Sequence, residues 1–298
     1  MSEVFDDERG RLFGLAYRLL GSATDAEDIV QEAFLRWHTA DQSAIDTPGT
    51  WLTKVVTNLC LNHLNSARVR RERTGPWLPE PVLAGDLGPL ESAEQRESVS
   101  LALLVLLERL TPAKRAVFVL REAFGYPYED IAELMETSET NCRQIHSRAR
   151  RRIGDGRTRF SPPDEQARRL IERFLTAARS GDLAALEDLL TADTTAWMDA
   201  GPPARLSVRG RNEVRRLAGT ALARFAPQTI VTEVNGAPAL LFVRTGALLG
   251  VTIFEIDDSR IHAIRTIADP RKLAFIQRRL ECGVSAAHVG ICGHTIDM

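Results

Sequence analysis

Apolar residues recur every three or four positions through the first part of the chain, which is the spacing of amphipathic helices. We expect one helix from Glu8 to Leu20, a second that Ser22 to Asp25 cap, and a third from Trp51 to about Arg71. The second helix carries an unbroken apolar stripe, made of Ala26, Ile29, Val30, Ala33, Phe34 and Trp37. Residues 1–73 are therefore predicted to form an all-helical domain.

The third helix has an outer face that is rich in asparagine, a mediocre helix former. Its spacing turns Leu52, Val55, Val56, Leu59 and His63 inward and Lys54, Thr57, Asn58, Leu61, Asn62 and Asn65 outward. Asparagine amides can hydrogen-bond the bases of a single strand. A polar surface that is simply tolerated is the competing interpretation.

Residues 74–90 are rich in proline and glycine and predict a linker. They contain Trp77-Leu-Pro-Glu-Pro, and because a tether has no need of a Trp-Leu pair, we expect this segment to dock. A second helical domain, residues 91–157, follows. We expect helices from Glu91 to Glu108 and from Ala113 to Phe124, separated by Leu110-Thr-Pro.

The segment Tyr128 to Arg152 has the layout of a helix-turn-helix, whose second helix enters the DNA major groove. Ser138 is a suitable N-cap for that second helix. Cys142, Ile145, Ala149 and Ile153 should pack inward, whereas the outer side carries Thr140, Gln144, Ser147 and Arg151, flanked by Arg143 and Arg148. Glutamine and arginine can read base edges, and arginine also holds phosphates. A solvated cationic helix of an ordinary helical domain is the alternative.

The pattern changes after a second linker, residues 158–164. Residues 165–280 begin with helices, expected over Glu165–Ser180, Asp182–Leu190 and Glu213–Phe225. Strand-like alternation follows at Ile230–Val234, Ala239–Arg244, Leu248–Ile256 and Ile261–Ile267, with hairpin signals such as Asn235-Gly236 between them. Helices followed by an antiparallel meander predict a separate α+β domain, with residues 281–298 as a C-terminal tail.

The net charge of the 298 residues is only −2, so DNA binding would have to come from local basic runs, at Arg68 to Arg73 and Arg148 to Arg159. No apolar run is long enough to span a bilayer, and the scattered cysteines fit a reducing cytosol, so we expect a cytoplasmic protein without a membrane partner. The tail residues Cys282, His288, Cys292 and His294 do not have zinc-finger spacing, so no metal is expected.

The first half resembles the extracytoplasmic-function (ECF) sigma factors of the sigma-70 family. Asp25-Ala-Glu-Asp-Ile-Val-Gln-Glu-Ala-Phe-Leu-Arg-Trp and the helix opened by Pro48-Gly-Thr-Trp are similar to their region 2. Leu110-Thr-Pro-Ala-Lys-Arg and the helix-turn-helix resemble region 4. The match covers about residues 5 to 155, with both modules in order.

The C-terminal part resembles a SnoaL-like domain of the cone-shaped fold, which one sigma subgroup carries fused after region 4. Trp77-Leu-Pro-Glu-Pro is similar to that subgroup's linker motif, and Asp269-Pro-Arg-Lys-Leu resembles its C-terminal Asn-Pro-Asp-Lys-Leu. Asp199-Ala-Gly-Pro-Pro stands where the subgroup has Asp-Gly-Gly-Gly-Lys, so the contacts of that loop are expected to differ here. The resemblance implies two all-α sigma domains followed by an α+β domain.

The resemblance also implies partners, namely core RNA polymerase and promoter DNA. Polymerase would meet Asp28, Gln31 and Glu32; the melted −10 strand would meet Lys54, Asn58 and Asn62; and the −35 element would meet Thr140, Arg143, Gln144, Ser147, Arg148 and Arg151. Trp77, Leu78, Asp269, Pro270, Lys272 and Leu273 would form a regulatory interface through which the third domain acts in cis.

No catalysis and no cofactor are expected of the chain, because the polymerase performs the chemistry. Asp199, Asp257 and His262 are the ionisable candidates for proton transfer in a SnoaL-like domain, but a structural role is favoured for each. The alternative hypothesis is a DNA-binding regulator that senses a small molecule in an apolar pocket of this domain.

Overall fold

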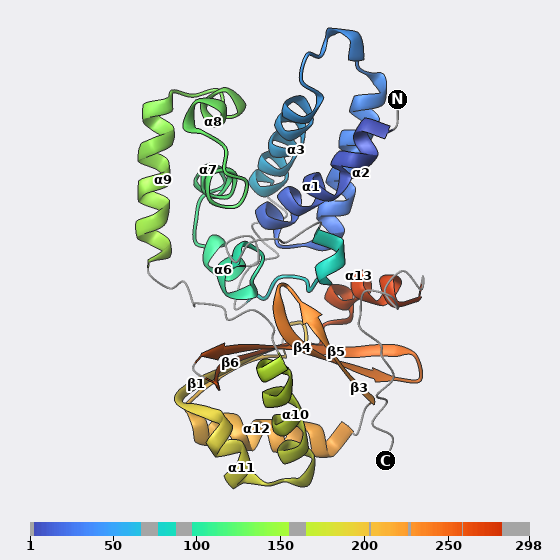
Figure 1. Ribbon diagram of the computed structural model, residues 1–298, viewed down its shortest axis with the longest axis vertical. Coiled ribbons are helices and arrows are strands. Elements are labelled where there is room, and N and C mark those ends of the chain that lie inside the picture. The colour runs from blue at the N-terminus through green and yellow to red at the C-terminus, as the bar shows by residue number, and fades with distance from the viewer. Residues whose placement is uncertain are drawn as a thin grey trace. The chain divides into compact units, whose positions relative to one another are not determined.

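The computed structural model describes residues 3–66, 77–87, 97–154, 165–202, 204–225, 228–257 and 259–281. The chain divides into two compact units (Figure 1). The first comprises residues 1–79 and 86–157, and the second comprises residues 80–85 and 158–298. The basic run at Arg68 to Arg73 and the four Cys and His residues of the tail lie outside the described residues.

The first unit begins with three helices that pack on one another (Figure 1). They are α1 (Glu3–Leu20), α2 (Ala23–Thr39) and α3 (Pro48–Asn65), with a short 3-10 helix, η1 (Gln42–Ala44), before α3. Ser22 caps α2 as predicted, because its hydroxyl accepts a hydrogen bond from the Asp25 amide at 3.1 Å. The described part of α3 ends at Asn65, and the predicted extension to Arg71 lies beyond it.

The second half of the unit contains α6 (Leu101–Leu107), α7 (Pro112–Glu122), α8 (Tyr128–Leu134) and α9 (Glu139–Ile153), preceded by a 3-10 turn, η2 (Ala84–Leu87). The predicted helix from Glu91 to Glu108 is interrupted, since Ser100 caps α6 by accepting from the Leu103 amide; residues 91–96 lie outside the described part. Helix α7 is central, contacting α1 and α3 as well as α8 and α9.

The second unit is a six-stranded mixed sheet with helices. The strands are β1 (Leu190–Asp199), β2 (Arg205–Arg209), β3 (Gln228–Val234), β4 (Ala237–Arg244), β5 (Ala247–Asp257) and β6 (Arg260–Ile267), in the order β2-β1-β6-β5-β4-β3. The helices are α10 (Glu165–Ser180), α11 (Leu183–Leu189), α12 (Arg211–Phe225) and α13 (Pro270–Glu281).

The predicted antiparallel meander is confirmed for β3 to β6. The hairpin turn predicted at Asn235-Gly236 joins β3 to β4, and both residues have the positive φ that such a turn requires, 54° and 70°. The prediction missed β1 and β2, and β1 runs parallel to β6. The unit is nevertheless an α+β domain, as predicted. Its core joins α10, α11 and α12 to one face of the sheet, with Phe174 packed edge-on against Phe254 at 5.2 Å.

The linker segment docks, as predicted. The Trp77 ring lies against Gly21, at the turn between α1 and α2 in the first unit, and leaves no room there for a Cβ atom. Val82 belongs to the second unit, where its amide donates to the Asn235 side-chain oxygen at 3.1 Å and its carbonyl accepts from the Asn235 amide at 2.9 Å. Leu83 forms an isolated bridge with Val234.

Candidate nucleic-acid interface

Helix α9 presents one polar, cationic face to solvent. Its six predicted DNA contacts, Thr140, Arg143, Gln144, Ser147, Arg148 and Arg151, are all exposed. The opposite face consists of Cys142, His146, Ala149 and Ile153, which are all buried. Ser138 caps the helix by accepting from the Asn141 amide at 3.2 Å, as predicted. A helix held on one side and free on the other can enter a groove without unfolding its domain.

A hydrogen-bond chain behind α9 fixes its orientation. The two ring nitrogens of His146 lie 2.9 Å from the Tyr128 hydroxyl and 2.9 Å from a Glu122 carboxylate oxygen. The guanidinium of Arg143 lies over the Tyr128 ring at 4.6 Å from its centroid and also pairs with Glu139. Arg143 therefore braces α9 against α8, whereas Gln144, Arg148 and Arg151 project from the helix.

The prediction of the inner face was wrong at one position. Ile145 is half-buried, and His146 occupies the buried position expected for it. The spacing 142, 146, 149, 153 is an equally good helical stripe, but a polar side chain was not expected to be buried. Tyr128 and Glu122 hydrogen-bond both ring nitrogens of His146, which offsets the cost of removing them from water.

On α3, Lys54, Asn58 and Asn62 follow one another at a spacing of four residues and form one polar stripe. Asn62 is exposed, and Lys54 and Asn58 are partly exposed. The Lys54 ammonium lies 3.1 Å from a carboxylate oxygen of Glu136, in the turn between α8 and α9.

Thr57 was expected on the same outer face, but it is fully buried, as is Thr53. Thr53 Oγ1 accepts from Arg11 at 2.9 Å and lies 3.1 Å from the Tyr126 hydroxyl. The inner side of α3 therefore includes hydroxyls that join it to α1 and to the segment before α8.

On α2, the predicted polymerase contacts Asp28, Gln31 and Glu32 are all exposed. Leu35 continues the same helical face and is 58% exposed. The prediction missed Leu35 because it lies next to the apolar stripe in sequence. This face of α2 therefore combines exposed acidic side chains with an exposed apolar one.

Comparisons with known proteins agree with this arrangement. The family model for sigma-70 region 2 matches residues 4–70, and that for sigma-70 region 4 matches residues 100–153. The ECF RNA polymerase sigma factor SigJ of Mycobacterium tuberculosis is 38% identical over 289 residues, which cover 90% of this chain and 91% of SigJ. The chain belongs to the ECF sigma factor family.

Two further relatives extend this result along the chain. SigI of M. tuberculosis is 35% identical, over 95% of this sigma factor and 98% of SigI. The crystal structure of M. tuberculosis SigJ superposes with a TM-score of 0.72 at 32% identity, covering 92% of this chain and 98% of that one. The sigma factor therefore binds core RNA polymerase and directs it to promoters. The alternative, a ligand-sensing regulator outside this family, is not favoured.

In the second unit, the structure brings together the two segments that resemble the subgroup's motifs. The Lys272 ammonium lies 2.6 Å from one Asp199 carboxylate oxygen, and the Arg205 guanidinium lies 3.2 Å from the other. The Asp199 backbone oxygen accepts from the amides of Ala268 and Asp269. Burial lowers the pKa of Lys272, although the Asp199 carboxylate opposes this shift.

The loop after Asp199 is shaped by the same cluster. Gly201 has a φ of 82°, and a Cβ atom there would lie 3.0 Å from the Asp269 carboxylate. The pKa of Asp269 is lowered chiefly by the hydrogen bond from Arg271. The Asp199-Ala-Gly-Pro-Pro loop thus keeps the aspartate that pairs with Lys272 and a glycine that lies close to the Asp269 carboxylate. Pro203 lies outside the described residues.

The residues predicted for a regulatory interface occupy different environments. Leu78, Asp269, Lys272 and Leu273 are buried, Trp77 is partly exposed, and Pro270 at the start of α13 is exposed. The side chains of Asp269 and Lys272 are engaged in ion pairs within the second unit. These ion pairs hold the start of α13 against the Asp199 loop.

Among the three ionisable candidates, Asp199 is held by Lys272 and Arg205, and Asp257 is exposed at the end of β5. His262 Nε2 lies 3.2 Å from Glu255. Burial raises the pKa of Glu255, but hydrogen bonds from His262 and Arg265 outweigh it, and the net direction is downward. All three candidates lie outside the lining of the cavity described next.

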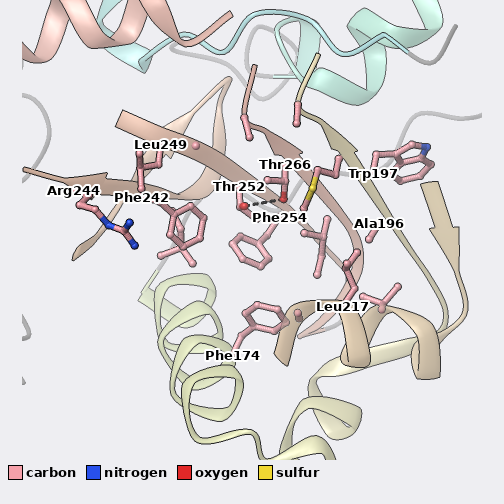
Figure 2. Close-up of a pocket in the computed structure, with 18 residues that line it drawn as sticks. Phe174, Ala196, Trp197, Leu217, Phe242, Arg244, Leu249, Thr252, Phe254 and Thr266 are labelled. Carbon is pink, nitrogen blue, oxygen red and sulfur yellow. Dashed lines mark hydrogen bonds between the residues drawn. The ribbon is translucent and has the colours of Figure 1, made fainter. Parts of the chain in front are cut away.

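The second unit encloses a cavity of about 470 Å³ between the sheet and helices α10 and α12 (Figure 2). Its lining consists of Phe174, Ala196, Trp197, Met198, Ala200, Val214, Leu217, Ala218, Leu240, Phe242, Arg244, Leu249, Gly250, Thr252, Phe254, Ile264, Thr266 and Ala268. Over the described residues, we find no cluster of His, Cys, Asp or Glu that could hold a metal ion and no helix able to cross a membrane.

Proposed function

We propose that this sigma factor reads the −35 element with the exposed face of α9. The observation that carries the proposal is the separation of that helix into a buried stripe and a polar face that holds all six predicted contacts. Gln144 lies at the middle of the face and is suited to a base edge, whereas Arg148 and Arg151 on either side are suited to phosphates.

We further propose that Lys54, Asn58 and Asn62 contact the melted −10 strand. The stripe combines one cation with two amides, and such a surface can hold a backbone phosphate while the amides bond unpaired bases. Because Lys54 is paired with Glu136, binding the strand exchanges one ion pair for another. The exchange costs little, since both side chains are well exposed.

The α2 face is proposed to contact core polymerase, in the cytoplasm. Asp28 and Glu32 supply negative charge that steers a basic partner surface, and Leu35 supplies apolar area for the centre of the contact. Leu35→Ala is therefore expected to weaken the retention of the protein by core polymerase in a pull-down.

We propose that the second unit regulates promoter recognition in cis and has no catalytic turnover. The lack of turnover is supported by the cavity, whose described lining contains no carboxylate or imidazole to move a proton. The regulatory role is supported by the linker, in which residues 77–79 pack into the first unit and residues 80–85 belong to the second.

The test is transcription of total genomic DNA from the source organism by purified core polymerase plus this chain, with sequencing of the transcript 5′ ends. Full-length protein should produce a defined set of start sites that core polymerase alone does not. Gln144→Ala should redistribute or remove those sites. If core polymerase does not retain the protein in a pull-down, the proposal fails.

The regulatory role is tested in the same assay with chains truncated after Ala268 and after Pro162. The first removes α13 and the Asp199–Lys272 pair, and the second removes the whole α+β domain. Transcript yield should change in both. Unchanged yield in both truncations would exclude a regulatory role while leaving promoter recognition intact.

A further inference from the structure

The described lining of the cavity in the second unit is mostly apolar, and its polar groups lie at a few positions. In this described lining the walls are mostly aliphatic and aromatic, with Phe174, Phe242 and Phe254 gathered on one side of one hydroxyl pair (Figure 2). That pair is Thr252 and Thr266, on neighbouring strands β5 and β6, with 2.8 Å between their hydroxyl oxygens. A volume of about 470 Å³ lies within the range of pockets that hold small organic molecules.

The hydroxyl pair fixes what polar group the cavity can accept. Two threonines have two O–H groups, and their mutual hydrogen bond uses one of them. The second O–H can donate to an oxygen of a bound molecule. Thr252 is itself buried, so a ligand that left this hydroxyl without a partner in an apolar surrounding would forgo a hydrogen bond.

Charge is disfavoured in the same place. Transfer of a carboxylate or an ammonium into an apolar interior is very costly unless an opposite charge meets it. In the described lining, Arg244 alone is charged, and it is exposed at the end of β4 near the solvent side. An ion pair there is screened by water and adds little.

We propose that the cavity binds a neutral, predominantly apolar small molecule through one carbonyl or hydroxyl oxygen, which Thr252 and Thr266 hydrogen-bond. The site binds and does not transform its ligand. The site uses no residue of the promoter-reading surfaces of the first unit. Its test is therefore separate from the tests of the proposed promoter contacts.

The experiment uses the full-length protein and the fluorescent ketone prodan, a neutral aromatic molecule with one carbonyl oxygen. Its emission should shift to shorter wavelength on binding, and 2-acetylnaphthalene, 2-ethylnaphthalene and 2-naphthoate should then compete for the cavity. These three share one ring system and differ in carrying a neutral carbonyl, no oxygen or an anion. We expect the ketone to bind about 3–10 times more tightly than the hydrocarbon and the anion to bind most weakly.

The Thr252→Val/Thr266→Val double variant removes both hydroxyls at nearly constant shape; both must go, because either one alone would keep an O–H free to donate. It should abolish the preference for the ketone while leaving the hydrocarbon's affinity unchanged. Thr232→Val, on β3 outside the cavity lining, is the matched control and should leave both affinities unchanged. Ala218→Phe, which fills the cavity without touching the hydroxyls, should weaken the ketone and the hydrocarbon together.

Three outcomes would overturn the proposal. The first is that prodan does not bind, or binds equally to Ala218→Phe. The second is that the ketone preference survives the Thr252→Val/Thr266→Val double variant. The third is that 2-naphthoate binds most tightly and loses that affinity in Arg244→Gln, which would make the cavity an anion site.

Discussion

Removal of Arg148 and Arg151 together should flatten the salt dependence of promoter binding. Both guanidinium groups are exposed on α9, and Arg151 makes only a long 3.5 Å contact, to Ser147. The double Arg→Ala variant should therefore keep the fold. Arg152 is unsuitable for this purpose, because its Nε donates to the Arg109 carbonyl at 2.8 Å and ties α9 to the end of α6.

The magnitude follows from counterion release. Each phosphate contact contributes about 0.9 to the slope of log affinity against log salt concentration. Two contacts contribute about 1.8, so a fourfold rise in salt should weaken the wild type about 12-fold more than the variant. The measurement is anisotropy of a labelled −35 duplex with the polymerase holoenzyme at four salt concentrations.

Arg150→Ala is the control for the loss of one positive charge from the same helix. Arg150 is exposed on the same helix but lies about 120° around it from Gln144, at roughly 100° per residue. Its loss changes net charge by the same amount as either single substitution, and we expect a slope near that of the wild type. A wild-type slope in the Arg148/Arg151 double variant would refute the phosphate contacts. Gln144→Ala should instead cost about 1–3 kcal/mol at one base position, and an equal loss on every sequence would refute base reading.

Three other predictions concern single residues. Glu136→Gln frees the Lys54 ammonium and should tighten holoenzyme binding to a −10 fork by at most about fivefold, measured by filter binding; weaker binding would contradict the role of the cation. Gly21→Ala should lower the free energy of unfolding in urea by more than Gly125→Ala. Both glycines have positive φ, 66° and 69°, but of the two only Gly21 lies against the Trp77 indole. Equal losses of stability in the two variants would show that the Trp77 contact contributes nothing. The pKa of the Glu255 carboxyl is lowered in the folded protein, so the stability that this group contributes is present above its unfolded pKa of about 4.5 and is lost as the pH falls below that value. The free energy of unfolding of Glu255→Gln should therefore fall less steeply with acid than that of the wild type. An unchanged slope would refute this.

Much of the first unit could be predicted from sequence because its elements are set by local rules. Helical spacing placed α2 and α9, and both serine caps were identified correctly. The errors lie where tertiary contacts decide. His146 is buried because Tyr128 and Glu122 receive its ring nitrogens, and those partners lie 18 and 24 residues away.

In the second unit, contacts between residues distant in sequence decide even more of the structure, so more of it could not be predicted. Strands β1 and β2 were missed because β1 contains Thr191, Asp193 and Thr195, which dilute any apolar alternation. Its pairing partner, β6, is more than 60 residues distant and parallel, so no turn signals it. The same parallel pairing carries Asp199 to the position where Lys272 reaches it, which is why two segments singled out separately form one cluster.

The proposed promoter contacts require the first unit to open. Elements centred near −10 and −35 are separated by about 25 base pairs, or roughly 85 Å of duplex at 3.4 Å per pair. In the unit, the turn before α9 touches α3 through Glu136 and Lys54 at 3.1 Å, so one compact body cannot place α3 and α9 on both elements.

The contacts between the two halves include buried polar ones, and these favour such opening. Arg18 of α1 is buried against Ser98, to which its Nε donates at 2.8 Å, and burial lowers its pKa to about 10. Arg115 of α7 is also buried and donates to the Leu19 carbonyl at 2.8 Å. Separation returns both guanidinium groups to water, and their recovered hydration offsets part of the apolar area exposed. Polymerase binding favours the open state only through contacts that the compact state cannot make, because the α2 face is exposed in the compact unit and binding to it alone does not distinguish the two states.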